Sequence, residues 1–144
     1  MKGSHRGRIL VVDDERSMRE MLEIFLGREG YEVTGHSSAS DALACLDQDQ
    51  DFDLIITDIN MPGLTGLDLL KSVSQFEKDI PVIMITAYGS PDSAVEAMKL
   101  GAVDYITKPI NPDMVRARVG NHLELKRYRD SLEHLVREKT RELQ

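Results

Sequence analysis

The stretch LIITDINMPG (residues 54–63) begins as a continuous run of apolar and β-branched residues and then stops at an acid. Such a run is typical of a strand that is buried on both faces of a parallel sheet. Asp58 ends the strand, and a Pro-Gly turn follows shortly after. Because burial of an unpaired carboxylate costs several kcal/mol or more, Asp58 must be solvated, paired or used in chemistry.

The length and composition are those of one ordinary globular domain with a short additional segment. The chain has 144 residues, of which 41% are hydrophobic and 30% charged, and its net charge is −7. No apolar run approaches the roughly 18 residues of a membrane span, and no signal-peptide pattern opens the chain, so we expect a cytoplasmic protein without membrane contact. The acidic balance argues against direct nucleic-acid contact by this segment. A single cysteine, Cys45, excludes an internal disulfide framework and a cysteine-cluster metal site.

Two further runs, residues 9–12 and 82–85, resemble the buried strand at 54–57, and weaker strands are expected at 32–36 and 104–107. Apolar residues at helical spacing lie between the strands in four stripes: Met18, Met21, Leu22, Phe25 and Leu26; Ala39, Ala42, Leu43 and Leu46; Leu67, Leu70 and Val73; and Ala94, Ala97 and Met98. The order strand–helix, repeated five times, predicts a doubly wound α/β domain with a parallel sheet.

The expected helix ends carry local signals. Ser38 resembles the first residue of a capping box, and Ser90 and Asn111 each precede a proline, as N-cap residues often do. Glycine is favoured where a helix ends in the left-handed conformation. Two helices are therefore expected to stop at Gly30 and Gly101.

Reactive side chains come at the ends of four of the five strands. Asp13 and Asp14 follow the first strand, Asp58 the third, Thr86 the fourth and Lys108 the fifth. The carboxyl ends of parallel strands share one edge of the sheet, where sites form. Three carboxylates gathered there repel by about 4 kcal/mol per close pair at moderate effective dielectric, which one lysine cannot offset. A divalent cation can, and ligands that are all oxygen favour Mg²⁺.

Each of these residues has a simpler interpretation when it is taken alone. Asp13 or Asp14 can cap the helix that begins near Arg16. Thr86 can be a strand-end hydroxyl that bonds to the local backbone, and Lys108 can be a solvated surface lysine. The joint pattern, rather than any one residue, favours a functional site.

Four segments occur in order: VVDDE (11–15), IITDINMPGLTG (55–66), MITAYG (84–89) and DYITKPI (104–110). Together they resemble the receiver domains of two-component response regulators, over roughly residues 8–120. The resemblance implies a flavodoxin-like, five-stranded sheet with strand order 2-1-3-4-5. It also implies a signalling switch that accepts a phosphoryl group from a sensor histidine kinase or a phosphotransfer protein. Such a domain is not an enzyme, apart from catalysing its own phosphorylation and dephosphorylation.

The resemblance assigns metal and phosphoryl roles to individual residues. Asp58 is the expected phosphoacceptor. Asp14 and Asp58 are expected to bind Mg²⁺ directly, with the backbone carbonyl of Asn60 as a third ligand, and Asp13 mainly through a metal-bound water. Lys108 is expected to pair with the phosphate.

The same resemblance predicts how the phosphoryl group is sensed. Thr86 is expected to donate its hydroxyl to a phosphoryl oxygen, and Tyr105 to reorient with that threonine. Pro109 matches a proline whose preceding peptide bond is cis. Asn60 and Tyr88 occupy loop positions that are expected to influence dephosphorylation.

The two ends of the chain read differently from the domain. Residues 1–7 show no periodicity and are expected to be a flexible tail. Residues 121–144 are expected to be a helical linker to an output domain, because 3-4-3 spacing places an apolar coiled-coil seam on one helix: Leu125, Tyr128, Leu132 and Leu135. This helix can fray singly into solvent or pair in parallel, and we expect a weak homodimer.

Two rival functions remain open at this point. An aspartyl-phosphate phosphohydrolase of the haloacid dehalogenase type carries a second Asp two residues after its nucleophile, where this chain has Asn60. A flavin-binding module on a similar sheet needs a hydroxyl- and glycine-rich phosphate loop after the first strand, where this chain has DDERS (13–17). Turnover of a phosphomonoester or a yellow protein would favour one of these.

Overall fold

The computed structural model describes residues 6–86 and 91–142. Within these residues, five strands and five helices alternate. The strands are β1 (Arg8–Val12), β2 (Glu32–His36), β3 (Leu54–Asp58), β4 (Val82–Thr86) and β5 (Asp104–Thr107). The helices are α1 (Arg16–Arg28), α2 (Ala39–Gln48), α3 (Gly66–Val73), α4 (Pro91–Lys99) and α5 (Pro112–Glu142).

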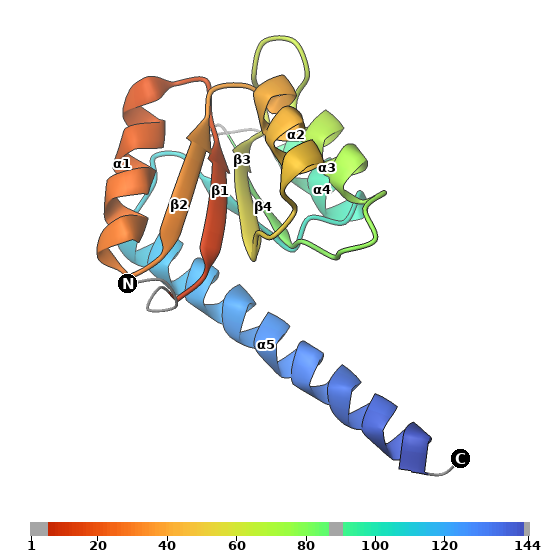
Figure 1. The fold of residues 1–144 in the computed structure, drawn as a ribbon. Helices are drawn as coiled ribbons and strands as arrows, with labels where there is room; N and C mark the ends of the chain where they lie inside the picture. Colours follow the sequence, from red (N-terminus) through yellow and green to blue (C-terminus); the bar gives the residue numbers. More distant parts are fainter. Residues whose placement is uncertain (1–5, 87–90, 143–144) are drawn as a thin grey trace.

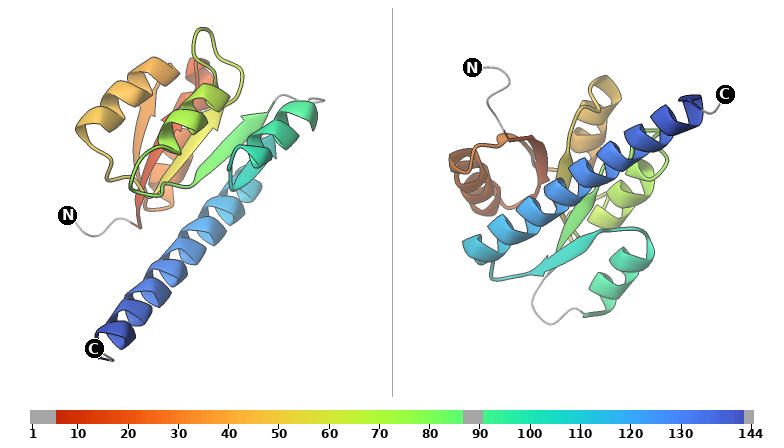
Figure 2. Two further views of the ribbon diagram at one scale, coloured as in Figure 1. Left: turned by 90° about the vertical axis from the view of Figure 1, so that its right-hand side faces the viewer. Right: turned by 90° about the horizontal axis from the view of Figure 1, so that it is seen from below.

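The strands form one parallel sheet in the order β2-β1-β3-β4-β5. The predicted doubly wound fold with this strand order is therefore confirmed. Helices α1 and α5 cover one face of the sheet, and α2, α3 and α4 cover the other (Figures 1 and 2). Every residue of β3 and β4 is buried, as the continuous apolar runs predicted.

The helix stripes are confirmed in α1, α2 and α3, and the stripe in α4 needs one correction. In α3, Leu70 and Val73 are buried and Leu67 packs against the core, while the fully buried Leu69 was not among the predicted residues. In α4, Ala94 and Ala97 are buried but Met98 is exposed. Both helices are short, so a 3-4 pattern fits two neighbouring faces almost equally well.

The helix ends follow the sequence signals where the chain is described. The hydroxyl of Ser38 accepts a hydrogen bond from the backbone of Asp41 at 3.1 Å, and Gly30 and Gly101 have φ angles of 96° and 110°. Ser90 lies outside the described residues. The reciprocal capping box occurs instead at α3, where the side chain of Asp68 accepts from the backbone N–H of Thr65 at 2.9 Å.

Arg6 and Gly7, which precede β1, are hydrogen-bonded to the start of β2 and the turn before it. The backbone N–H of Arg6 donates to the carbonyl of Gly30 at 2.8 Å, and the carbonyl of Gly7 accepts from Glu32 at 2.9 Å. Residues 1–5 lie outside the described residues.

Helix α5 continues well beyond the domain body (Figures 1 and 2). Its first half packs on the sheet through a row of buried side chains, Val115, Val119 and Leu123. Its second half passes the edge of the sheet where the strands begin, and its side chains there are largely exposed. No helix of the described residues is both long and apolar enough to cross a bilayer, including α5 with its 31 residues.

A partly buried carboxylate links α5 to β5. Asp104, the first residue of β5, accepts hydrogen bonds from the guanidinium of Arg118 and, at 2.9 Å, from His122 Nε2. Burial alone raises the pKa of Asp104, but the hydrogen bonds from Arg118 and His122 outweigh it and hold the pKa below its ordinary value. The folded state therefore stabilises the ionised form of Asp104 relative to the unfolded chain.

We expect Asp104→Asn to lower the free energy of unfolding at pH 7 by about 1–2 kcal/mol, because hydrogen bonds to a charged acceptor are lost. A depressed folded pKa stabilises the protein above the unfolded pKa of about 3.9 and loses its effect as the pH falls below it. The difference between wild type and mutant should therefore shrink between about pH 5 and pH 3 in urea titrations. Asp130→Asn, which removes the exposed pair with Lys126, is the control; equal losses would contradict this account.

Candidate functional site

Three carboxylates meet at the edge of the sheet where the strands end. Asp13 and Asp14 directly follow β1, and Asp58 is the last residue of β3, the neighbouring strand. One oxygen from each carboxylate lies within 4.8 Å of the other two. Asp13 and Asp58 are buried, while Asp14 is exposed. The structure thus brings together the acidic residues that the sequence placed after separate strands.

Asp13 is held by three hydrogen bonds. Its N–H donates to the carbonyl of His36 at 3.1 Å, and its Oδ1 accepts from the backbone N–H of Glu15 at 2.9 Å. Arg19 Nη1 donates to the Asp13 carbonyl at 2.8 Å. The residue at the N-cap of α1 is Glu15, so neither Asp13 nor Asp14 is the helix cap that the simpler interpretation required.

The second carboxylate oxygen of Asp13 is buried and has no hydrogen-bond partner within residues 6–86 and 91–142. Burial raises the pKa of the Asp13 carboxyl, and the charges of Asp58 and Asp14 act in the same direction. The hydrogen bond from Glu15 and the nearby charge of Lys108 oppose this rise without cancelling it. A buried oxygen without a partner beside two further carboxylates is a suitable donor set for a hard cation.

Lys108, which directly follows β5, reaches the carboxylate of Asp58. Its Nζ lies 3.2 Å from Asp58 Oδ2, and Asp58 Oδ1 accepts from the backbone N–H of Asn60 at 3.1 Å. Partial burial alone lowers the pKa of Lys108, but the hydrogen bond to Asp58 and the surrounding carboxylates raise it above its ordinary value. The peptide bond between Lys108 and Pro109 is cis. Lys108 is therefore a paired cation at this edge rather than a solvated surface lysine.

Thr86 and Tyr105 lie on the neighbouring strands β4 and β5. Thr86 is the buried last residue of β4, and its carbonyl accepts from the backbone N–H of Lys108 at 2.9 Å. Tyr105 is paired with Met84 in the strand register, two residues before Thr86, and its side chain is 41% exposed. Tyr88 lies outside the described residues.

Comparison with known proteins identifies the family of the domain that carries this acidic site. The family described as "Response regulator receiver domain" matches residues 9–120, most of the chain. The chain belongs to this family. The receiver resemblance seen in the four sequence segments is thereby confirmed, and the phosphohydrolase alternative finds no support.

Individual relatives agree with the family assignment. The receiver domain is 41% identical to the response regulator protein PilR of Pseudomonas aeruginosa over 121 residues, which is 84% of this chain and 27% of PilR. It is 38% identical over 117 residues to the transcriptional regulatory protein FixJ of Bradyrhizobium diazoefficiens, covering 79% of this chain and 55% of FixJ. The chain thus spans between about a quarter and about half the length of these two relatives.

Solved structures show the same fold. A response regulator receiver domain protein from Clostridium thermocellum superposes with a TM-score of 0.80 at 32% identity, over 85% of this chain and 98% of that one. NtrX from Brucella abortus gives a TM-score of 0.84 at 33% identity, over 90% of this chain and 30% of NtrX. The receiver fold and membership in two-component signalling are therefore secure.

Two residues support the acidic edge of the receiver domain and were not singled out from the sequence. Arg19 holds the Asp13 carbonyl from α1. Gly66 lies against the backbone of β3, where a Cβ atom would come within 2.2 Å of the carbonyl oxygen of Asp58. The signal for Gly66 was present in the motif IITDINMPGLTG, because a glycine at the start of a helix points to a close approach of two backbones.

Proposed function

We propose that this receiver domain is a phosphorylation-dependent switch in which Asp58 accepts a phosphoryl group. The observation that carries the proposal is the carboxylate of Asp58, which lies at a strand end 3.2 Å from Lys108 and within 4.8 Å of the Asp13 and Asp14 carboxylates. The donor is a cognate sensor histidine kinase or a phosphotransfer protein, as membership of the family suggests.

In the proposed reaction, a carboxylate oxygen of Asp58 attacks the phosphorus atom and the bond from phosphorus to the donor nitrogen breaks. A carboxylate nucleophile needs no general base, so the protein has mainly to position the reactants and neutralise charge. Lys108 supplies one positive charge beside the incoming phosphoryl oxygens. The hydroxyl of Thr86, at the end of the next strand, donates a hydrogen bond to one of them.

Mg²⁺ fits the acidic edge as the cofactor. Asp14, Asp58 and the backbone carbonyl of Asn60 are the proposed direct ligands, and Asp13 acts mainly through a metal-bound water. The buried Asp13 oxygen without a hydrogen-bond partner among the described residues supports this assignment. When bound, the ion offsets the repulsion between the carboxylates and neutralises charge on the phosphoryl oxygens.

The switch connects this chemistry to the surface of the domain. Thr86 is buried beside the site, whereas Tyr105 on the adjacent strand is substantially exposed. We propose that Tyr105 reorients when Thr86 turns toward a phosphoryl oxygen, so that the exposed face of β5 changes on phosphorylation. In this proposal Asp58 and Lys108 take part in phosphoryl transfer, and Thr86 and Tyr105 change conformation in response to it.

We place the output of the switch at the C-terminal end of α5. Residues 121–144 are proposed to be a linker to an output module, and the exposed apolar row on this helix supports a weak homodimer. Burying four large side chains per chain, at about 1.5–3 kcal/mol each, is of the same order as the cost of association, so only a weak dimer is expected. The charged surface, with 30% charged residues, is compatible with the proposed cytoplasmic location.

Incubation of the full chain with Mg²⁺ and a small phosphodonor should add one acyl phosphate, detected by intact-mass spectrometry. Chelation of the metal should prevent the labelling, because the carboxylates then repel the incoming phosphoryl group. Lys108→Ala should lower the labelling rate by at least about tenfold, since it removes a cation from the site. Thr86→Ala should still be labelled.

Two results would count against this function. Equal loss of labelling in the Lys108 and Thr86 variants would contradict their separate roles. Multiple turnover of a generic phosphomonoester by the wild-type protein would instead favour a phosphohydrolase.

A further inference from the structure

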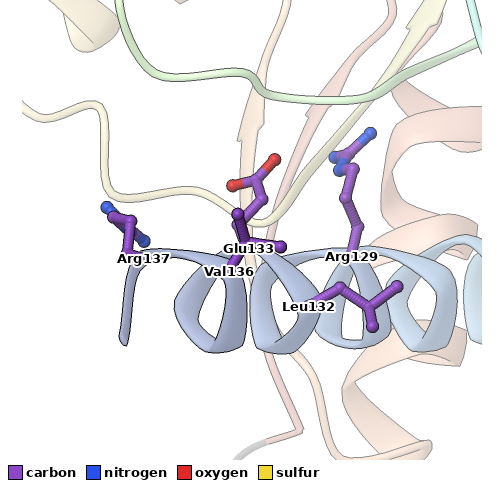
Figure 3. A pocket seen from close by; sticks show the side chains of 5 residues that line it. All are labelled: Arg129, Leu132, Glu133, Val136 and Arg137. Carbon is purple, nitrogen blue, oxygen red and sulfur yellow. The ribbon is translucent and has the colours of Figure 1, made fainter. Parts of the chain in front are cut away.

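Helix α5 carries a row of exposed apolar side chains beyond the domain body. The row consists of four residues that are between 45% and 67% exposed: Leu125, Tyr128, Leu132 and Leu135. Shallow grooves lie along the helix at both ends of the row, one beside Leu125 and Tyr128 and the other beside Leu132 and Val136 (Figure 3). A contiguous apolar row of this kind on a helix surface marks a binding surface.

The row faces away from the domain. With about 100° between successive residues, its centre lies about 160° around the helix from the buried row Val115, Val119 and Leu123. Figure 3 shows Arg129 and Glu133 on one side of α5 and Leu132 on the other. The domain body therefore does not lie between the apolar row and a second helix approaching it.

We infer that this row binds the same row of a second copy of the chain as a parallel, in-register coiled coil. In the heptad pattern, Leu125 and Leu132 take the a positions and Tyr128 and Leu135 the d positions. The inference rests on the homodimer proposed above and is independent of the phosphoacceptor chemistry. A second copy is the favoured occupant because a single apolar row is self-complementary under twofold symmetry.

Charged residues beside the row determine the orientation. Glu124 and Arg129 take the g and e positions, which face each other across a parallel dimer when they are five residues apart. Each helix then places Glu124 beside Arg129 of the second copy, twice per dimer. An antiparallel pair instead places Glu124 near Glu138 of the second copy, where like charges repel.

Arg129 is available for this exchange of partners. In the single chain its guanidinium lies 3.2 Å from Asp79, and both side chains of that pair are about half exposed or more. Exposed pairs of this kind contribute little, so an ion pair between chains can replace it. Just before it, Arg127 donates to the carbonyl of Arg6, which ties the helix to the domain body at the start of the apolar row.

Charge reversal in the full chain tests the pairing. Glu124→Arg and Arg129→Glu should each weaken the dimer by about five- to tenfold in sedimentation equilibrium, and the double variant should restore wild-type affinity. Asp79→Asn is the matched control, because it removes only the contact within one chain and should not weaken the dimer. Failure of the double variant to recover would overturn the Glu124–Arg129 assignment.

Disulfide trapping tests the orientation. In a Cys45→Ser background, Lys139→Cys places one thiol at an a position near the end of the helix. Mild oxidation should link most of the dimer covalently if the helices are parallel, whereas antiparallel helices hold these thiols about 24 Å apart. A dimer that does not cross-link would overturn the parallel inference alone. A protein that stays monomeric at millimolar concentration would overturn the homodimer itself, while Mg²⁺-dependent labelling would still report on the phosphoacceptor site.

Discussion

Asp58→Asn should reduce phosphoryl labelling to background while leaving the fold intact. An amide is a poor nucleophile and forms no acyl phosphate, so no other change of similar size removes the reaction as completely. The Asn side chain keeps an oxygen that can accept from Asn60 or Lys108, the two groups that contact Asp58 in the structure. Intact-mass spectrometry after incubation with Mg²⁺ and a small phosphodonor measures the loss.

The control for this experiment is Asp47→Asn, which changes an exposed carboxylate on α2 and should be labelled like the wild type. Removing one charge from the cluster of three carboxylates also relieves repulsion, so the Asp58 variant should be at least as stable as the wild type without metal. Persistent labelling in the Asp58 variant, for example at Asp14, would falsify the assignment of the phosphoacceptor.

The central strands of the sheet could be predicted from the sequence because each is encoded by a short, continuous apolar run. Residues 54–57 and 82–85 are too continuous for a half-exposed strand, and both are buried throughout. Because the strands are parallel, their carboxyl ends lie at one edge of the sheet. The proximity of Asp13, Asp14 and Asp58 follows from that topology and not from their spacing in the chain.

The contacts that hold the acidic edge in place were harder to predict. Arg19 reads as one more charged residue on an amphipathic helix, yet its guanidinium donates to the carbonyl of Asp13. Arg19 also packs closely on Gly35 of β2, where a Cβ atom would lie 3.3 Å from Arg19 Cδ and would overlap the carboxylate of Glu23. Such contacts depend on how α1 packs on β2, which periodicity does not specify.

Helix α5 illustrates a different limit of sequence reasoning. The 3-4-3 spacing predicted a helix over residues 121–144, and in the structure one helix runs from Pro112 to Glu142. Two apolar rows share this helix, one buried on the sheet through Val115 and Val119 and the other exposed beyond it. The sequence located only the exposed row; the buried row, and the nearly opposite direction in which it faces, are seen only in the three-dimensional arrangement.

Gly66→Ala should destabilise the protein by about 3 kcal/mol and slow phosphorylation at Asp58. The added Cβ would meet the carbonyl oxygen of Asp58 at 2.2 Å and the Cα of Ile59 at 2.9 Å, and these backbone atoms cannot rotate away as a side chain does. The N–H of Gly66 also donates to the carbonyl of Ile59 at 2.9 Å, which holds the two segments together. Relief of the overlap must therefore displace either α3 or the end of β3 that carries the phosphoacceptor.

Gly27→Ala separates this steric effect from the general effect of replacing a helical glycine. Apart from its chain neighbours and the local backbone of α1, a Cβ at Gly27 would meet no heavy atom of the described residues within 4 Å, so alanine there should stabilise α1 by about 0.5–1 kcal/mol through its higher helix propensity. Urea unfolding gives both free energies, and the labelling rate under folded conditions gives the effect on Asp58. If Gly66→Ala matched Gly27→Ala in both measurements, the close packing of α3 against β3 would not be what positions Asp58.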